Sequence, residues 1–162
     1  MSVTLPPSGT RGFVMPKLVQ PLNKAGMRVS HLIYRMLGDR MKAQGQPLLL
    51  LKTVGARTGD KRHAILTRFP DPNHPGAWLV VGSGAGSKRH PDWCYNLVKN
   101  PDEVWVQVGK DTLKVQPQSL TGAERDKAWE LVVSEAPGYK KYETTTDREI
   151  PIIRLTPDRV LA

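Results

Sequence analysis

Two segments decide the fold of this 162-residue chain: KTVGARTGDKRHAILTRF (residues 52–69) and GAWLVVGSGAGSKRHPDWCYNLVKN (residues 76–100). Each joins an apolar, strand-like run to a loop that carries both glycine and basic residues. Glycine lets backbone amides approach phosphate oxygens closely, and basic side chains add charge that the backbone lacks. The two loops therefore predict a site for a phosphorylated, anionic ligand.

Basic residues are concentrated in the first half of the chain. Residues 1–90 carry a net charge of +11 and residues 91–162 a net charge of −2, which gives +9 overall. This asymmetry indicates an anionic partner for the N-terminal half, such as a phosphorylated cofactor, a membrane surface or nucleic acid. Aromatic residues make up only 6% of the chain, and few of them lie among the basic residues. We therefore expect no nucleic-acid partner, because single-strand binders usually interleave aromatic and basic side chains.

Cysteine content and apolar run length indicate the compartment. The single cysteine, Cys94, cannot form an internal disulfide, which fits a reducing, cytoplasmic environment. The longest apolar run spans only residues 77–81, so we expect neither a membrane span nor a secretory signal. The histidines lack metal-ligand spacing, and we expect no metal site.

Periodicity and turn residues divide the chain into three parts. We predict a flexible arm over residues 1–16, an amphipathic helical segment over 17–45 and a barrel domain over 46–162. Strands are predicted over residues 48–53, 63–69, 78–81, 104–108, 112–116 and 150–155, and helices begin at Pro91 and after Thr121. Few helices separate the strands, so the predicted class is α+β: a small, mostly antiparallel β-barrel with flanking helices.

The segment from Leu22 to Leu37 has helical apolar spacing with basic residues between the apolar ones. Most amphipathic helices face their own core, so we expect this helix to cover the barrel. The alternative is that it lies on the surface of an anionic membrane, which would make a membrane quinone an attractive acceptor.

Each candidate motif also has a purely structural interpretation. The loop of residues 54–62 could be a solvated connection, and the Gly/Ser run of residues 82–87 could be a flexible linker. Tyr139 and Tyr142 are three residues apart, so on a helix they would share a face, either for packing or to place two phenols in one cleft.

Several motifs that follow one another between Leu48 and Pro157 carry a family resemblance. They are Gly55-Ala56-Arg57-Thr58-Gly59 with Arg62, Ser83-Gly84-Ala85-Gly86, His90-Pro91 with Trp93, Asn96-Leu97, Asn100-Pro101, Pro137-Gly138-Tyr139 with Tyr142, and Thr146-Asp147-Arg148 with Ile150-Pro151. Taken together and in this order, they resemble the deazaflavin-dependent nitroreductase family, which uses the deazaflavin coenzyme F-420. The resemblance implies a split β-barrel like that of FMN-binding oxidoreductases.

The resemblance also implies which residues bind the cofactor. The phosphate and the acidic glutamyl tail would be held by Arg57, Thr58, Lys61 and Arg62, assisted by Lys88. The ring would be lined by Ala64, Ile65 and Leu66 and by Ser83, Gly84, Ala85 and Gly86, with Trp93 supporting the second loop. The basic surplus fits a polyanionic tail.

The activity implied by the resemblance is hydride transfer from the reduced cofactor to a quinone, enone or nitro compound. Tyr139 or Tyr142 would supply the accompanying proton. The chain carries Ala136 where related nitroreductases often have a further tyrosine, which puts nitroimidazole activation in doubt. Alternatives are an FMN-dependent oxidoreductase of the same fold and a non-catalytic deazaflavin carrier; the protein could be a monomer or a homodimer.

Overall fold

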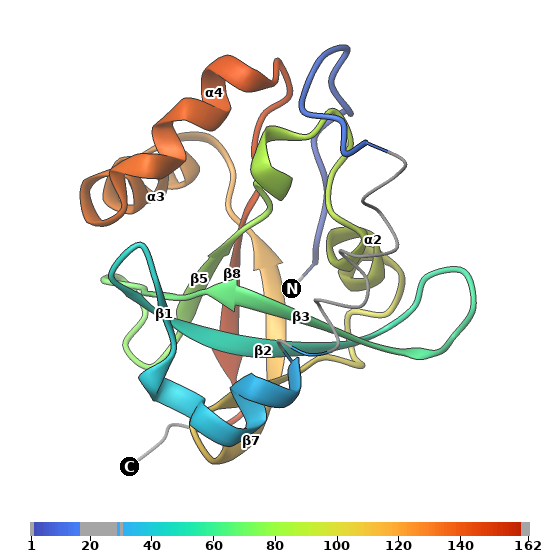
Figure 1. The fold of residues 1–162 in the computed structure, drawn as a ribbon, viewed down its shortest axis with the longest axis vertical. Coiled ribbons are helices and arrows are strands. Elements are labelled where there is room, and N and C mark those ends of the chain that lie inside the picture. Colours follow the sequence, from blue (N-terminus) through green and yellow to red (C-terminus); the bar gives the residue numbers. More distant parts are fainter. Residues whose placement is uncertain (1, 17–28, 30, 160–162) are drawn as a thin grey trace.

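The computed structural model describes residues 2–16, 29 and 31–159 of the chain. Its strands are β1 (Lys42–Ala43), β2 (Gln46–Val54), β3 (Lys61–Thr67), β4 (Phe69–Pro70), β5 (Trp78–Val81), β6 (Trp105–Val108), β7 (Asp111–Ser119) and β8 (Ile152–Pro157). Its helices are α2 (Asp92–Lys99), α3 (Gly122–Glu135) and α4 (Tyr142–Thr145), with 3-10 turns η1 (Gly38–Arg40), η2 (Gly84–Gly86) and η3 (Pro137–Lys141). Residues 31–37 are also helical. Figure 1 shows the arrangement of these elements.

The strands form one curled antiparallel sheet in the order β1-β2-β6-β7-β8-β5-β4, with β3 paired to the other side of β2. Strands β3 and β5 contact each other, but no backbone pairing joins them within the described residues. The barrel is therefore open along this seam. The α+β class and the antiparallel split barrel predicted from the sequence are confirmed.

Strand β2 separates two apolar clusters because its side chains alternate between two faces. Leu49 and Leu51 point into the main core, where α2 closes the barrel. Leu48 and Leu50 point outward and pack under Tyr34 of helix 31–37. All four leucines are buried, which explains why this strand has a continuous apolar run rather than an alternating one.

A third apolar cluster lies between the sheet and the helical end of the molecule. Ala128, Trp129 and Val132 of α3 pack against Leu79 and Ile152 of strands β5 and β8. In Figure 1, α3 and α4 lie at the opposite end of the barrel from helix 31–37. The expected helix after Thr121 is present, although the Thr121 side chain makes no capping hydrogen bond.

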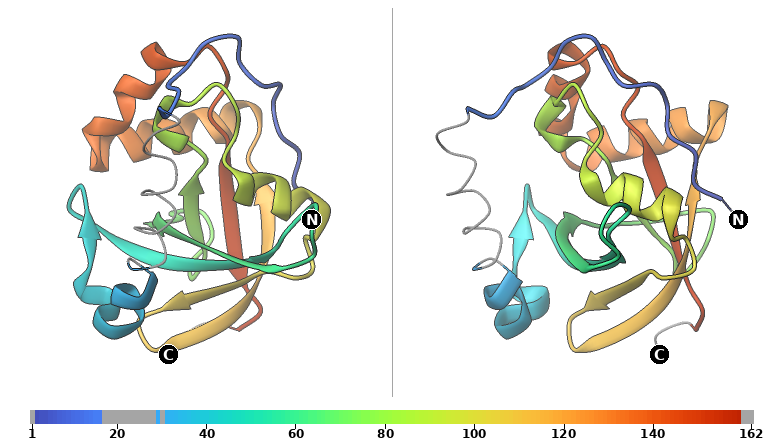
Figure 2. Two further views of the ribbon diagram at one scale, coloured as in Figure 1. Left: turned by 45° about the vertical axis from the view of Figure 1, so that its right-hand side comes forward. Right: turned by 90° about the vertical axis from the view of Figure 1, so that its right-hand side faces the viewer.

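Residues 2–16 lie along the barrel and do not extend from it as the predicted flexible arm. Val3 is buried in the main core, the Gly9 amide donates to the Lys88 carbonyl at 2.9 Å, and Phe13 forms a bridge with Ser87. Figure 2 shows this segment passing from the α2 side towards the helical end. Proline and glycine exclude regular structure here, but the extended backbone still finds hydrogen-bond partners. The three-part division of the chain stays a prediction.

Helix 31–37 covers the barrel with Tyr34 and not with its apolar stripe. The Tyr34 ring is fully buried, and its hydroxyl lies 3.0 Å from the Gln107 carbonyl oxygen. Leu32 and Met36, one turn apart, are 58% and 78% exposed. The expectation that the apolar face would cover the barrel is therefore wrong for the described part of the helix. Residues 22–28 of the predicted helix lie outside the described residues.

Among the residues that the structure describes, no helix is both long enough and apolar enough to cross a membrane.

Candidate functional site

The basic loop joins β2 to β3 as an ordered hairpin connection. The Gly55 amide donates to the Asp60 carbonyl at 2.7 Å, and the Gly59 amide donates to the Gly55 carbonyl at 3.0 Å. Gly59 has a φ of 74°, in the left-handed region that favours glycine. The Thr58 hydroxyl accepts hydrogen bonds from the Asp60 amide and the Arg62 guanidinium, so the loop has a defined shape.

Two asparagines, Asn96 in α2 and Asn100 directly after its last residue, hold the base of this loop. The Asn96 side chain accepts a hydrogen bond from the Ala56 amide at 2.9 Å and donates one to the Thr53 hydroxyl at 3.1 Å. One turn further along, Asn100 donates to the Val54 carbonyl at 3.2 Å. Helix α2 therefore fixes where the basic loop leaves the barrel.

The glycine loop between β5 and α2 is the most unusual backbone of the structure. Gly84, Ala85 and Gly86 have φ values of 52°, 54° and 76°, and Ala85 is a non-glycine residue in the left-handed region. A side chain at Gly86 would place its Cβ 2.8 Å from the Thr145 Cβ, so glycine is needed there for a close approach. The Gly86 amide donates to the Ser83 carbonyl at 2.9 Å and is already used within the loop.

The guanidinium of Arg148 holds this loop by its carbonyl groups. It donates to the carbonyl oxygens of Ser87 at 2.7 Å, Gly82 at 3.0 Å and Ser83 at 2.7 Å. Arg148 is buried, so these hydrogen bonds replace the solvation that its charge has lost. A single side chain thus fixes both ends of the loop.

His90 completes the same network in its neutral form. Its Nδ1 lies 3.1 Å from Nη1 of Arg148, and its Nε2 lies 2.6 Å from the Pro6 carbonyl oxygen. Arginine can only donate, so Nδ1 accepts and Nε2 carries the proton that is donated to Pro6. Burial lowers the pKa of His90, and the charges of Arg148 and Arg89 act in the same direction, whereas the Pro6 carbonyl opposes them.

The structure divides the predicted phosphate-binding residues between two faces of the hairpin. Lys61 pairs with Val54 and Arg62 with Thr53, and neighbouring strand residues point to opposite faces. Arg62 turns towards Thr58 and lies 3.7 Å from the Asp60 carboxylate. The sequence did not predict this separation of Lys61 from Arg62.

Three of the predicted cationic residues are exposed at the loops, namely Arg57, Lys61 and Lys88. Within the described residues, none of the three forms an ion pair with a carboxylate. Arg89 differs from them, because it contacts Asp92 at 2.6 Å and lies over the Tyr95 ring. The chemistry of this donor set fits a phosphate and an acidic tail.

The ring-lining residues expected on β3 are half-buried. Ala64 and Leu66 pack against the main core, and Ile65 packs on the opposite face beside Leu50. Trp93 is only 8% exposed and packs within the main core; its support of the glycine loop stays a prediction.

Tyr139 and Tyr142 are brought together at the helical end. Their rings meet edge to face with centroids 5.6 Å apart, and Tyr139 also packs against Phe69. Tyr139 is 7% exposed. Burial raises the pKa of its phenol, whereas a hydrogen bond with Thr67 lowers it, and the neighbouring Tyr142 acts with the burial.

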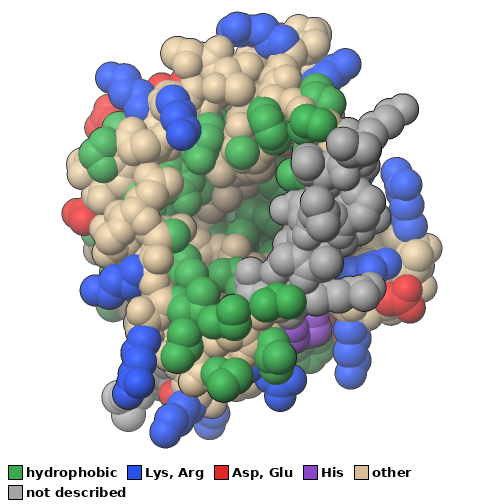
Figure 3. Space-filling model, in the orientation of Figure 1, with side chains coloured by type: hydrophobic (Ala, Val, Ile, Leu, Met, Phe, Trp, Pro, Cys, Tyr) green, Lys and Arg blue, Asp and Glu red, His purple; other side chains and the backbone are tan. Residues whose placement is uncertain are grey.

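A hollow opens in the middle of the face seen in Figure 3. Comparison with Figure 1, in the same orientation, places it between the end of β3, η2 and the α3–α4 end of the molecule. Apolar side chains line the hollow, and basic side chains surround it on the outer surface. The predicted ring-binding segments of β3 and the glycine loop therefore border one depression.

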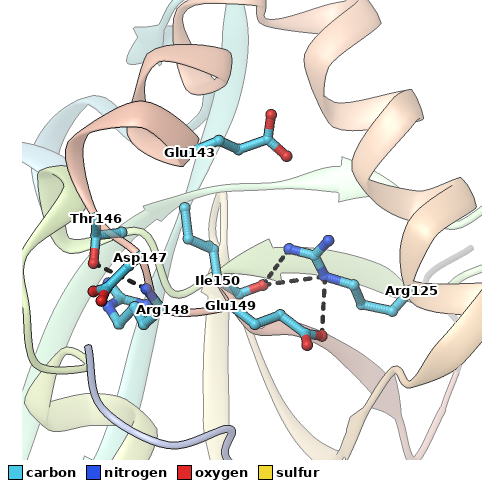
Figure 4. A pocket seen from close by; sticks show the side chains of 7 residues that line it. All are labelled: Arg125, Glu143, Thr146, Asp147, Arg148, Glu149 and Ile150. Carbon is cyan, nitrogen blue, oxygen red and sulfur yellow. Dashed lines mark hydrogen bonds and ion pairs between the residues drawn. The ribbon is translucent and has the colours of Figure 1, made fainter. Parts of the chain in front are cut away.

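A separate cavity of about 310 Å³ is lined by Arg125, Glu143 and residues 146–150 (Figure 4). Its two arginines are already occupied: Arg148 by the glycine loop, and Arg125 by the Ile150 carbonyl at 2.7 Å and by Glu149 at 3.6 Å. It offers an anionic ligand no cation that lacks a partner. This cavity is therefore a poorer candidate for an anionic cofactor than the hollow.

Sequence reasoning gave no role to Arg148 or Asn96, and it expected His90 to favour an anion beside Lys88 and Arg89 and not to hold the backbone, although all three lie in the motifs of the family resemblance. Each of them acts on the backbone of another segment, and no local periodicity signals such a contact. The signal that could have found them is the presence of polar residues inside otherwise apolar or glycine-rich segments.

Comparisons with known proteins agree with this geometry. Residues 27–157 match the family model described as F420H(2)-dependent quinone reductase. An F420H(2)-dependent quinone reductase of Mycobacterium tuberculosis is 35% identical over 137 residues, which cover 80% of this chain and 89% of the relative. A solved structure of an F420-H2-dependent reductase is 37% identical with a TM-score of 0.59, covering 67% of this chain and 93% of that one. A second solved structure, whose description says only that it is a domain-swapped dimer, is 30% identical with a TM-score of 0.59, covering 84% of this chain and 99% of that one.

The chain belongs to the F420H(2)-dependent quinone reductase family, a family of oxidoreductases whose cofactor is coenzyme F420. The family resemblance seen in the sequence motifs is therefore confirmed.

The neutral state of His90 predicts a dependence of stability on pH. The pKa of His90 in the folded protein is lower than the ordinary value of about 6.5 in the unfolded chain. Below about pH 6.5 the unfolded chain takes up a proton that the folded protein does not, so the free energy of unfolding falls, by up to about 1.4 kcal/mol per pH unit. Urea unfolding at a series of pH values should show a weaker dependence for His90→Gln than for the wild type. An unchanged dependence in His90→Gln would contradict the account.

Proposed function

We propose that this protein transfers a hydride from reduced coenzyme F420 to a quinone bound in the hollow beside β3 and η2. The single observation that carries the proposal is that the apolar hollow is bordered by the glycine loop and by β3, the strand that follows the basic loop. Membership of the quinone reductase family supports the same chemistry. When bound, the reduced cofactor supplies the hydride.

The basic loop is proposed to hold the anionic end of the cofactor. Arg57, Lys61 and Lys88 are exposed, and Arg62 is oriented by Thr58. Charge-assisted hydrogen bonds from these groups to phosphate and carboxylate oxygens are stronger than neutral ones. The tail would thus pass around the tip of the hairpin, where Lys61 and Arg62 lie on opposite faces.

The ring is proposed to lie against β3 and the glycine loop. The backbone of residues 64–66 and of residues 83–85 would border it, and the loop is held from behind by Arg148. A loop that is fixed before binding loses little conformational freedom when the ring arrives. Arg148 is thus a positioning residue in this proposal.

Reduction of a quinone by a hydride also consumes one proton. Tyr139 and Tyr142 are the proposed donors, since their rings meet edge to face in η3 and α4, at the helical end of the molecule that borders the hollow. Burial raises the pKa of Tyr139, which keeps its phenol protonated at neutral pH. A positioned donor of this kind typically contributes about 100-fold or more to the rate.

The activity itself is tested by following oxidation of reduced F420 by absorbance, with quinone, enone and nitro acceptors in parallel. We expect the quinone to be reduced fastest. Cofactor that binds and is never oxidised by any acceptor would contradict the proposal and favour a carrier.

Replacing the predicted anchors should weaken cofactor binding without unfolding the protein. Arg57→Ala and Arg62→Ala each remove a charge-assisted contact, so the Kd for F420 should rise about tenfold or more. Both residues are exposed, and the fold should be retained by circular dichroism. Arg40→Ala, at an exposed arginine of η1, should bind as the wild type does. Unchanged affinity in both loop variants would refute their assignment.

Replacing the proposed proton donors should affect turnover more than binding. Tyr139→Phe is expected to lower kcat by about 100-fold while the Kd for F420 changes little, because the ring and its packing remain. Tyr142→Phe tests the second candidate in the same assay. Tyr95→Phe, at the other side of the glycine loop, is the matched control. If neither Tyr139→Phe nor Tyr142→Phe slows turnover, the proton comes from solvent.

We also propose that helix 31–37 contacts an anionic membrane surface, where quinones reside. Its exposed apolar residues are Leu32, Ile33, Met36 and Leu37, together with Val29 one turn earlier. They recur every three or four residues and therefore form one face, and Arg35 and Arg40 are exposed among and after them. An apolar face with basic neighbours is typical of helices that lie in the membrane interface.

Sedimentation with liposomes tests this contact. The wild type should bind vesicles that contain anionic lipid more strongly than neutral vesicles, because apolar burial and charge attraction add. Met36→Glu should reduce binding several-fold, whereas Val98→Glu, at an exposed apolar residue of α2, should not. Failure of the wild type to bind anionic liposomes would remove the proposal.

A further inference from the structure

Two histidines stack on the outer face of the β2–β3 hairpin, away from the glycine loop. His31 lies in helix 31–37 and His63 on β3; their ring centroids are 4.3 Å apart and the ring planes differ by 20°. His31 is half-buried and His63 exposed, so solvent reaches the pair.

Three further basic residues surround this pair. Lys52 is the cross-strand partner of His63 in the β2–β3 register. Lys61 lies two residues before His63 and therefore on the same face of β3, and Arg35 follows His31 by one helical turn. The helix and both strands thus direct positive or titratable groups to one place, which we call the histidine cluster (His31, Arg35, Lys52, Lys61 and His63).

No carboxylate balances the histidine cluster within the described residues. None of its members forms an ion pair there with an aspartate or glutamate. The pKa of His31 is lowered by burial and then by Arg35 and Lys52; that of His63 is lowered by burial and by all four other members. Burial and Arg35 also lower the pKa of Lys52. The groups repel one another, and a bound anion would relieve that repulsion.

A metal ion does not fit the same place. Two imidazoles could act as ligands, but the neighbouring lysine and arginine charges repel a cation. Among the residues described, no group of three histidine, cysteine, aspartate or glutamate side chains could hold a metal ion. The chemistry of the cluster therefore selects an anion.

We propose that the histidine cluster binds a phosphate or carboxylate group, and that His31 and His63 take up protons when the anion binds. An imidazolium next to an anion gains attraction where it previously met only repulsion. By linkage, anion affinity must then increase as the pH falls through the range in which His31 and His63 take up protons. Anion binding at the histidine cluster can be measured without following hydride transfer, whether the anion is free or part of a larger ligand.

The direct test is a proton NMR titration of the histidines with and without inorganic phosphate, using sodium chloride at equal ionic strength as the control. Phosphate should raise the titration midpoints of His31 and His63 by about one pH unit and leave those of His74 and His90 in place. No movement of the His31 and His63 midpoints, or an equal movement of all four, would overturn the proposal.

Substitutions test whether phosphate binds to the histidine cluster itself or to the positive surface in general. His63→Asn and Lys52→Met should each raise the Kd for phosphate about tenfold at about pH 6.5, because each removes one favourable charge. His74→Asn and Lys110→Met are matched substitutions at exposed residues outside the cluster and should change the Kd little. Lys52→Met keeps the length of the side chain, so a folded variant remains available if His63→Asn is unstable. Equal affinity in all four variants would contradict the assignment.

Three ligands identify the source of the anion and keep this proposal distinct from the cofactor proposal. Inorganic phosphate, a short glutamate peptide and a deazaflavin fragment without phosphate or glutamates should be compared by the same NMR readout. If phosphate or peptide moves the titration midpoints of His31 and His63 and the fragment does not, the anion site is supported. The ligand with the larger effect shows which group the site prefers. If the fragment binds at the hollow while phosphate and peptide leave the titration midpoints of His31 and His63 unchanged, the anion site is refuted. The cofactor proposal would not be affected by that result.

Discussion

The buried guanidinium of Arg148 is the contact on which the arrangement of the site depends. It satisfies carbonyl groups at both ends of the glycine loop and meets His90, which in turn reaches the Pro6 carbonyl of the N-terminal segment. A buried charge is tolerated only where hydrogen bonds replace its lost solvation, so this constellation is strongly constrained. The left-handed run from Gly84 to Gly86 is held in this way before any ligand arrives.

Helix α2 connects this network to the basic loop. It begins at Asp92, shortly after the glycine loop, and Asn96 within it and Asn100 just past its end bind the segment from Thr53 to Ala56. Two loops that are far apart in sequence therefore have a common support. A cofactor with a planar ring at one end and negative charge at the other could contact both loops at once, which is the geometry that the family assignment requires.

Much of the fold could be predicted from the sequence because local patterns determine it. Apolar runs and turn residues predict the leucine run of β2, the Gly109 turn and the positions of β5, β6 and α2. Only the boundaries of these elements differ from the prediction. Strand β8, for example, spans Ile152–Pro157 and not residues 150–155. The two-residue strands β1 and β4 were missed, since they are too short to show a period. Contacts between distant segments were also missed, including those of Arg148 and of residues 2–16.

The sequence predicts which two loops form the candidate site, but not to which face each of their side chains points. Sequence spacing groups Arg57, Lys61 and Arg62 together, whereas strand alternation sends Lys61 to the face of His63 and Arg62 to the other. Helix 31–37 shows the same limit: its period was recognised, but a single residue, Tyr34, decided which face meets the barrel. Which face a regular element buries depends on its partner, and that information is not local.

The central claim is that this support holds a deazaflavin in the hollow beside β3 and η2. The most direct test is a titration of the purified protein with oxidised F420, followed by tryptophan fluorescence, with FMN titrated in parallel. Trp93 lies beneath the proposed site and should report binding. The account predicts saturable, micromolar binding of F420 and much weaker binding of FMN. Preference for FMN, or no binding of F420, would contradict it.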